Sequence, residues 1–236
     1  QKLFPDVSVY LWWLVAYVIF VGINIKGVEL TLKVGLWVTV LAIAVLVIFF
    51  VGVIAKSAFN ADLLYNISPS DGGTKFLPMG WYGVFAALPF AIWFYLAIEQ
   101  LPLAAEETVD VVKDMPRALI SGIFTLLVLS VFTLVLIPGV NGGAAAIGVS
   151  QAPLADGFQA IYGVGATSAA LTLIAMIGLI ASFHTIIYAY GRVLFALSRA
   201  GYFPRWISVT GKKSHTPHRA LIFGAVIGFL CAVVID

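Results

Sequence analysis

The sequence has little charge and almost no cysteine. Asp, Glu, Lys and Arg make up 10% of its 236 residues, against about 25% in a typical soluble domain. Hydrophobic residues make up 62%, and the mean hydropathy of +1.07 excludes a soluble body carrying a single anchor. The net charge of +2 is too small for a nucleic-acid surface, and the lone Cys231 can form no intrachain disulfide. Composition therefore predicts a protein whose main solvent is lipid and which has no nucleic-acid partner.

Signatures of enzymes and cofactors are also missing from the sequence. It has no His-Glu-x-x-His zinc pair and no Gly-x-Ser-x-Gly nucleophile turn, and the segment from Gly211 to Ser214 lacks the spacing of a phosphate-binding loop. Three His and one Cys are scattered along the chain. We therefore expect no enzyme activity, no metal and no cofactor.

Six apolar runs of bilayer length dominate the sequence. A transmembrane helix needs about 17 to 25 predominantly apolar residues. The runs are continuous rather than alternating, which favours helices over strands, because lipid tolerates only helices and closed barrels. The expected fold is all-α, with about six transmembrane helices in a single transmembrane domain over residues 1–236. The expected spans are residues 7–23, 30–54, 79–105, 118–137, 168–190 and 220–234.

Basic residues concentrate in the loops that follow the first, third and fifth runs. This bias predicts that these loops are cytoplasmic, in a multi-pass protein of the cell (plasma or inner) membrane. Both ends of the chain would then face outward, so we expect it to be a fragment of a longer protein. A short helix is expected on the outer face over residues 153–161. The basic residues are Lys26, Lys33, Lys113, Arg117, Arg199, Arg205, Lys212, Lys213 and Arg219.

The third run contains two prolines, Pro89 and Pro102. Each removes a backbone donor and clashes with the preceding turn, so a straight helix is not expected. Broken helices of this kind line solute sites near the membrane centre in transporters. Trp93, Phe94 and Tyr95 either gate a solute there or serve as packing residues.

Two ionisable side chains fall in the inner half of the membrane by helical rise. Glu99 follows the expected break, and a carboxylate at such depth costs about 2.5 to 3.5 kcal/mol. Glu99 either exchanges a proton or contacts the cargo, or it is a structural residue bonded to backbone. His184 either relays a proton, with Glu99 as its partner, or stays neutral and bonds a neighbouring helix. Glu99 and His184 are the residues expected in proton coupling.

Three motifs resemble those of the amino acid–polyamine–organocation (APC) transporter superfamily. Asn24–Gly27 resembles the Asn-x-x-Gly turn between the family's fourth and fifth helices. Trp93–Glu99, with the charged loop at Lys113–Arg117, looks like its sixth helix and the loop after it. Tyr190–Pro204, with Thr216-Pro217, is similar to the loop after its eighth helix. The resemblance covers essentially the whole chain, as the fourth to ninth helices of a longer protein.

The resemblance implies the inverted-repeat, LeuT-like fold with a broken third span in this chain. It also implies secondary active transport of a small amine, ethanolamine or an amino acid, by alternating access with proton coupling or exchange. The segment Phe90–Glu107 looks most like the ethanolamine permeases, although amino-acid exchangers share its Trp and Glu. The family would place a gate at Trp93 and proton-linked gating at Glu99. The substrate-contacting residues it implies are Trp93, Phe94, Tyr95, Leu96, Ala97 and Ile98.

The family's Gly-rich break in helix one has no counterpart in this sequence. We therefore expect half of the binding site to be missing and this chain alone not to transport. Cationic amino-acid members place a lysine where this chain has Ala42, so that sodium substitute is not expected. The expected partners are the amine or amino-acid substrate, the lipid bilayer, protons and, as an option, a homo-oligomer. The alternative is a non-transporting membrane scaffold or sensor that keeps the fold.

Overall fold

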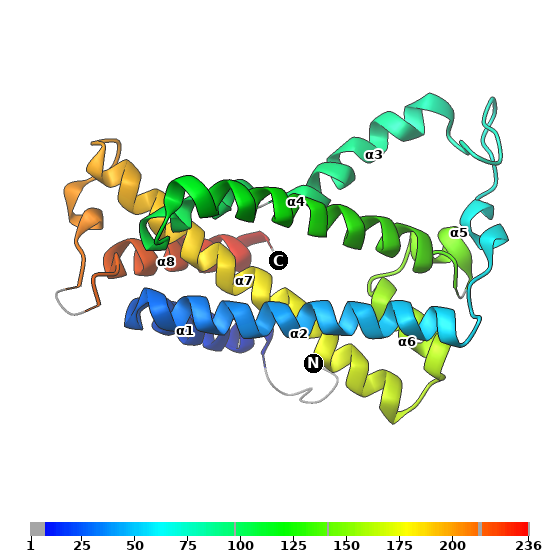
Figure 1. Ribbon diagram of the computed structural model, residues 1–236, viewed down its shortest axis with the longest axis horizontal. Helices are drawn as coiled ribbons and strands as arrows, with labels where there is room; N and C mark the ends of the chain where they lie inside the picture. Colours follow the sequence, from blue (N-terminus) through cyan, green and yellow to red (C-terminus); the bar gives the residue numbers. More distant parts are fainter. Residues whose placement is uncertain (1–7, 97, 141, 212–213, 236) are drawn as a thin grey trace. The chain divides into compact units, whose positions relative to one another are not determined.

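The computed structural model describes residues 8–96, 98–140, 142–211 and 214–235. Over these residues the chain is helical and contains no strand (Figure 1). Six segments are long and apolar enough to cross a membrane, which confirms the all-α fold and the six spans. They are α1 (Val9–Lys26), α2 (Val28–Ala55), the interrupted segment Gly80–Glu107, α4 (Val111–Leu136), α7 (Ala166–Arg199) and α8 (His218–Ile235).

The chain divides into two compact units. The first comprises Gln1–Leu41 and Ile177–Asp236, and so contains α1, the start of α2, the end of α7, and α8. The second comprises the continuous stretch Ala42–Met176, which lies between the two segments of the first unit in the sequence. The short 3-10 helix η3 (Arg205–Ser208) belongs to the first unit, whereas η1 (Ala61–Tyr65), α5 (Gly143–Ile147) and α6 (Pro153–Tyr162) belong to the second.

Close helix packing forms the core of the first unit, in which Val21, Ile187 and Leu221 are buried. The Tyr190 hydroxyl donates to the carbonyl of Leu221 on α8 (2.9 Å). A Cβ on Gly224 would lie 2.5 Å from the Tyr190 ring, so this position of α8 requires glycine. Small residues at membrane helix contacts allow such approach, because lipid supplies no hydrophobic drive for helices to associate.

Aromatic packing forms the core of the second unit. The rings of Phe49 on α2 and Phe158 on α6 meet edge to face at 5.6 Å, and both side chains are fully buried. A Cβ on Gly157 would lie 2.6 Å from the Phe49 ring, which explains a glycine inside α6. Pro153–Tyr162 is helical with Gly157, Phe158 and Ile161 buried, so the short helix expected over residues 153–161 is confirmed.

A side-chain clamp ties two loop segments of the second unit together. The amide nitrogen of Asn66 donates to the carbonyl of Gly142 (2.6 Å), and its amide oxygen accepts from the N–H of Ala145 (2.9 Å). Gly142 and Gly143 both have positive φ, +77° and +76°, a conformation that glycine adopts without steric cost. One side chain thus holds the start of α5 beside η1.

Replacing Phe158 with Ala should destabilise the second unit by about 3 to 5 kcal/mol, because it leaves a cavity beside Phe49. The measurement is the thermal unfolding midpoint of the full-length protein in detergent. Val164→Ala is the matched control, because Val164 is 90% exposed and should shift stability by less than about 0.5 kcal/mol. Equal midpoints for the two variants would contradict the packing described for α6.

Candidate functional site

The third membrane segment is interrupted near its middle. The helix α3 (Gly80–Tyr95) ends where Leu96 adopts extended angles (φ −58°, ψ 147°), and the 3-10 helix η2 (Ile98–Glu107) follows. Ala97, one of the expected substrate contacts, lies outside the described residues. The broken third span is therefore confirmed.

The break does not fall at either proline. Pro89 lies inside α3 and Pro102 inside η2. Pro89 leaves the carbonyl of Phe85 without its helical donor. Pro102 has no N–H for the carbonyls of Ile98 or Glu99, so regular α-helical bonding cannot resume directly after the break.

An open groove of about 410 Å³ runs along α3 to the break. Its apolar wall follows helical spacing, so one face of α3 forms it. Glu99, whose side chain is exposed, is the one charged group among its described lining residues. The volume falls in the range of about 300 to 1,000 Å³ that small-molecule sites occupy. The groove is lined by Leu88, Ala91, Ile92, Tyr95, Leu96 and Glu99.

Tyr95 is anchored at the break by a hydrogen bond to the buried Ser130. Its Oη lies 2.9 Å from the Oγ of Ser130 on α4. Ser130 already donates to the carbonyl of Leu127 (2.9 Å), and a hydroxyl carries one proton, so Tyr95 is the donor. In Figure 1, α3 slants away from α4 and the two approach each other near this end of α3. The sequence did not point to Ser130, because a lone serine in an apolar run has no distinguishing pattern.

The expected substrate-contacting residues do not all face this groove. Tyr95, Leu96 and Glu99 line it, whereas Trp93 and Phe94 are exposed but are not among its lining residues. Ile98 instead packs against α4, where a Cβ on Gly122 would lie 3.0 Å from its Cδ1.

Gln100 was also missed at the sequence level. Its side-chain oxygen is buried and, among the described side chains, is the one buried polar atom without a hydrogen-bond partner. A buried amide oxygen without a donor costs about 1 to 3 kcal/mol. It directly follows Glu99, so the start of η2 combines a carboxylate with a vacant acceptor.

His184 belongs to the first unit, whereas Glu99 belongs to the second. The ring is 1% exposed, with Nε2 at 2.9 Å from the carbonyl of Thr31 and Nδ1 at 3.4 Å from the amide nitrogen of Asn24. A carbonyl can only accept, so Nε2 carries the proton. The Asn24 amide also donates to Phe20 (2.8 Å) and has a second N–H for Nδ1. This assignment describes a neutral imidazole with both nitrogens bonded.

Two of the sequence motifs meet in the first unit, at the turn between α1 and α2. Asn24 lies in the last turn of α1, and Gly27, with a φ of +149°, is the residue between the two helices. The hydroxyl of Thr216, which is 2% exposed, donates to the carbonyl of Ile25 (2.8 Å). The loop before α8 is therefore tied directly to the end of α1.

Six segments that are long and apolar enough to cross a membrane make this chain an integral, multi-pass membrane protein. The interruption in one of them is the arrangement by which membrane transporters expose backbone to a solute. The profile of the amino acid permease family matches residues 2–235. The chain belongs to the amino acid permease family, which confirms the resemblance to the APC superfamily.

Individual relatives agree with this family assignment. The chain is 32% identical over 218 residues to an uncharacterized transporter of Rhizobium meliloti, covering 89% of this chain and 44% of the relative. It is 24% identical over 232 residues to the D-serine/D-alanine/glycine transporter of Escherichia coli, covering 96% and 48%. With the branched-chain amino acid permease of Bacillus subtilis it is 29% identical over 160 residues, covering 67% and 34%. The chain spans about half the length or less of these curated relatives.

Replacing His184 with Leu should lower the stability of the first unit by about 1 to 3 kcal/mol, because a buried N–H of Asn24 loses its acceptor. His184→Gln, which keeps polar atoms, should recover part of this loss. The thermal unfolding midpoint of the full-length protein in detergent measures both. His218→Leu serves as the control at a partly exposed position, and a loss equal to that of His184→Leu would contradict a specific role for the His184 bonds.

Proposed function

We propose that the full-length protein carrying this chain is a secondary active transporter of the cell membrane that moves a small amine, either an amino acid or ethanolamine, by alternating access. This chain would supply its fourth to ninth helices. The observation that carries the proposal is the break at Leu96, which joins an apolar groove to the carboxylate of Glu99. The family assignment supports transport rather than enzyme activity.

The chemistry of the break suits an ammonium group. An ammonium ion has three donors and no acceptor, so its site must present oxygen atoms. The charged acceptor among the described residues that line the groove is the Glu99 carboxylate. Hydrogen bonds to a charged group are about twice as strong as neutral ones. A free amino group is therefore the feature we propose the site to recognise.

The wall of the groove favours a small aliphatic remainder on the substrate. Leu88, Ala91 and Ile92 present only apolar atoms beyond the backbone. One relative is named for transport of D-serine, D-alanine and glycine, and another for branched-chain amino acids. Ethanolamine shares the amino group with these compounds but lacks their carboxylate, so competition between the two classes separates the candidates.

We assign proton coupling to Glu99 rather than to His184. Glu99 is exposed in the groove, so its carboxylate is accessible both to protons and to substrate. Both ring nitrogens of His184 are bonded in the neutral state, and protonation would place an N–H against the Asn24 donor. His184 is then a structural residue that holds α7 to the start of α2.

Glu99→Gln tests the coupling proposal by uptake of labelled glycine and labelled ethanolamine into proteoliposomes containing the full-length protein. We expect uptake to lose its dependence on external pH. We also expect substrate affinity to fall about tenfold to a hundredfold, because a hydrogen bond to a charged group contributes about 1.5 to 3 kcal/mol.

Glu29→Gln is the control for this variant, because Glu29 is 83% exposed and pairs with Lys33 at 2.6 Å. Unchanged rate and pH dependence in Glu99→Gln would refute the role of Glu99. Substrate binding without any flux in the unmodified protein would instead favour the non-transporting sensor.

Ala91→Leu tests whether the groove is the substrate path. The larger side chain should reduce uptake of leucine relative to glycine by about tenfold, since a methylene in an apolar site changes discrimination by about 1 to 3 kcal/mol. Ala87→Leu is the matched control, because Ala87 is on α3 but does not line the groove. An unchanged leucine-to-glycine ratio in Ala91→Leu would exclude this groove from the path.

A further inference from the structure

A second groove, of about 390 Å³, lies between α1 and α8 within the first unit. Its walls run from Leu14 to Ile25 on α1 and from Ile222 to Leu230 on α8, and apart from the Tyr17 hydroxyl their side chains are apolar. A Cβ built on Gly22 meets nothing within 4 Å, so Gly22 leaves part of the groove open. The substrate groove described above belongs to the other unit and shares no residue with it.

The length of this groove matches one leaflet of a bilayer. From Leu14 to Ile25, α1 rises about 17 Å, and half of a hydrocarbon core of about 30 Å is about 15 Å. An extended acyl chain spans one leaflet, and apart from the Tyr17 hydroxyl the lining presents only apolar side chains to it.

The two helices are antiparallel, so the groove has one end at which Ile25 and Ile222 lie. The Thr216 hydroxyl bonds the carbonyl of Ile25 at this end (2.8 Å), and the Tyr17 ring meets the Phe229 ring at 6.0 Å farther along. Lys26 and Arg219 each lie within one turn of this end on their own helix, and both are exposed.

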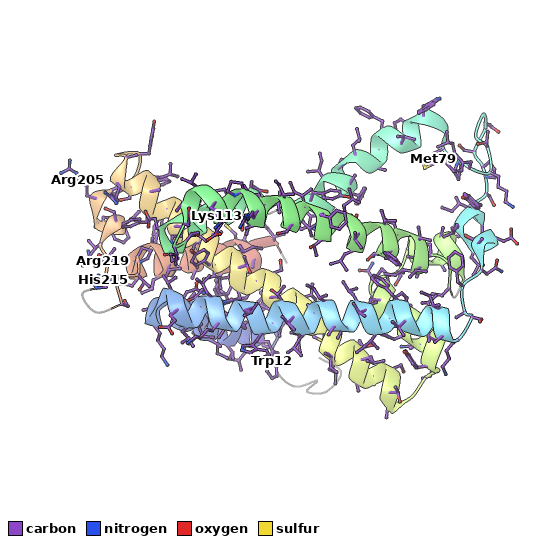
Figure 2. All side chains as sticks on the ribbon, viewed as in Figure 1. Trp12, Met79, Lys113, Arg205, His215 and Arg219 are labelled. Carbon is purple, nitrogen blue, oxygen red and sulfur yellow. The ribbon has the colours of Figure 1, made fainter. Side chains whose placement is uncertain are left out.

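Positive charge exceeds negative charge at this end of the first unit, where Glu29 is paired with Lys33. No Asp or Glu occurs between Val193 and Ile235 in the sequence. Arg205, His215 and Arg219 gather at the same end (Figure 2). One guanidinium nitrogen of Arg219 donates to the carbonyl of Trp206 (3.5 Å), which leaves its other donors for a ligand.

Trp206 indicates where this end of the groove lies relative to the lipid headgroups. The Trp206 ring meets Phe223 of α8 edge to face at 5.6 Å, and the residue is 48% exposed. Tryptophan is enriched at the level of the lipid headgroups. Lys26 and Arg219 are therefore positioned where headgroup phosphates lie, and the positive-inside bias assigns this side to the inner leaflet.

We propose that this groove binds an anionic phospholipid of the inner leaflet. One acyl chain lies between α1 and α8 over Gly22, and Lys26 and Arg219 hold the headgroup phosphate. A basic residue near an anionic membrane surface contributes about 1 kcal/mol, so each of the two should strengthen binding about fivefold. The apolar groove supplies the affinity for the chain, and the two cations supply the selectivity for a net negative headgroup.

The test titrates the full-length protein in zwitterionic detergent with phosphatidylglycerol and with phosphatidylcholine of the same chain length, counting bound lipids by native mass spectrometry. Gly22→Leu should abolish the tight phosphatidylglycerol site by filling the groove, and it does not weaken α1, because leucine forms helices better than glycine. The Lys26→Gln/Arg219→Gln variant should weaken the site about twenty- to thirtyfold. Thermal midpoints measured without added lipid confirm that each variant is folded.

Matched controls separate this site from general lipid contact. Val15→Leu alters an exposed residue of α1 outside the groove, and Lys33→Gln removes a cation that pairs with Glu29. Both should bind as the unmodified protein does. The proposal would be overturned if phosphatidylcholine bound as tightly as phosphatidylglycerol, or if Gly22→Leu bound phosphatidylglycerol as the unmodified protein does. It would also be overturned if glycerol phosphate, which has no acyl chains, displaced phosphatidylglycerol as well as phosphatidylglycerol itself does.

Discussion

Every backbone N–H and carbonyl that enters the bilayer must find a hydrogen-bond partner inside the protein, because an unpartnered group in hydrocarbon costs several kcal/mol. The membrane-length helices meet this constraint within themselves along most of their length. Regular helix bonding does not meet this constraint at Leu96, which is extended, or at the two prolines of the same span. Leu96 and Glu99 line the groove, and Gln100, with its unpartnered oxygen, follows them in the chain. Among the described residues, the candidate site thus lies where regular helix bonding is interrupted.

The same constraint explains why polar side chains inside each unit are bonded in fixed arrangements. Lipid is as apolar as leucine, so helices associate through close packing and hydrogen bonds. Gly224 lets α8 approach Tyr190, whose hydroxyl bonds α8 backbone. His184 bonds the carbonyl of Thr31 across from α7 to α2, and Asn24 completes the ring's contacts. These hydrogen bonds fix the register in which the helices pack, which apolar contacts alone would not define.

Hydropathy and charge were enough to predict the helices, because membrane insertion acts on the average character of about twenty residues. Prolines were enough to predict that the third span is broken, but not that the break falls at Leu96, since a proline weakens a helix without fixing the residue at which it ends and Pro89 stays inside α3. Ser130 as the anchor of Tyr95 was not predictable, because the partnership joins two helices whose register the sequence does not state. For His184 the sequence left a relay and a structural role open, and its two bonded nitrogens now favour the structural one.

The few charged residues of this chain differ in the free energy that their position relative to the membrane costs. Lys26 and Arg219 lie at the ends of spans, where water and headgroups solvate a cation, so retaining them requires no compensation from the fold. Glu99 lies within a span, where insertion of a carboxylate costs about 2.5 to 3.5 kcal/mol. Its side chain is exposed beside the break and lines the groove. Glu99 thus combines a costly position inside a membrane-length segment with exposure at the interruption of its helix.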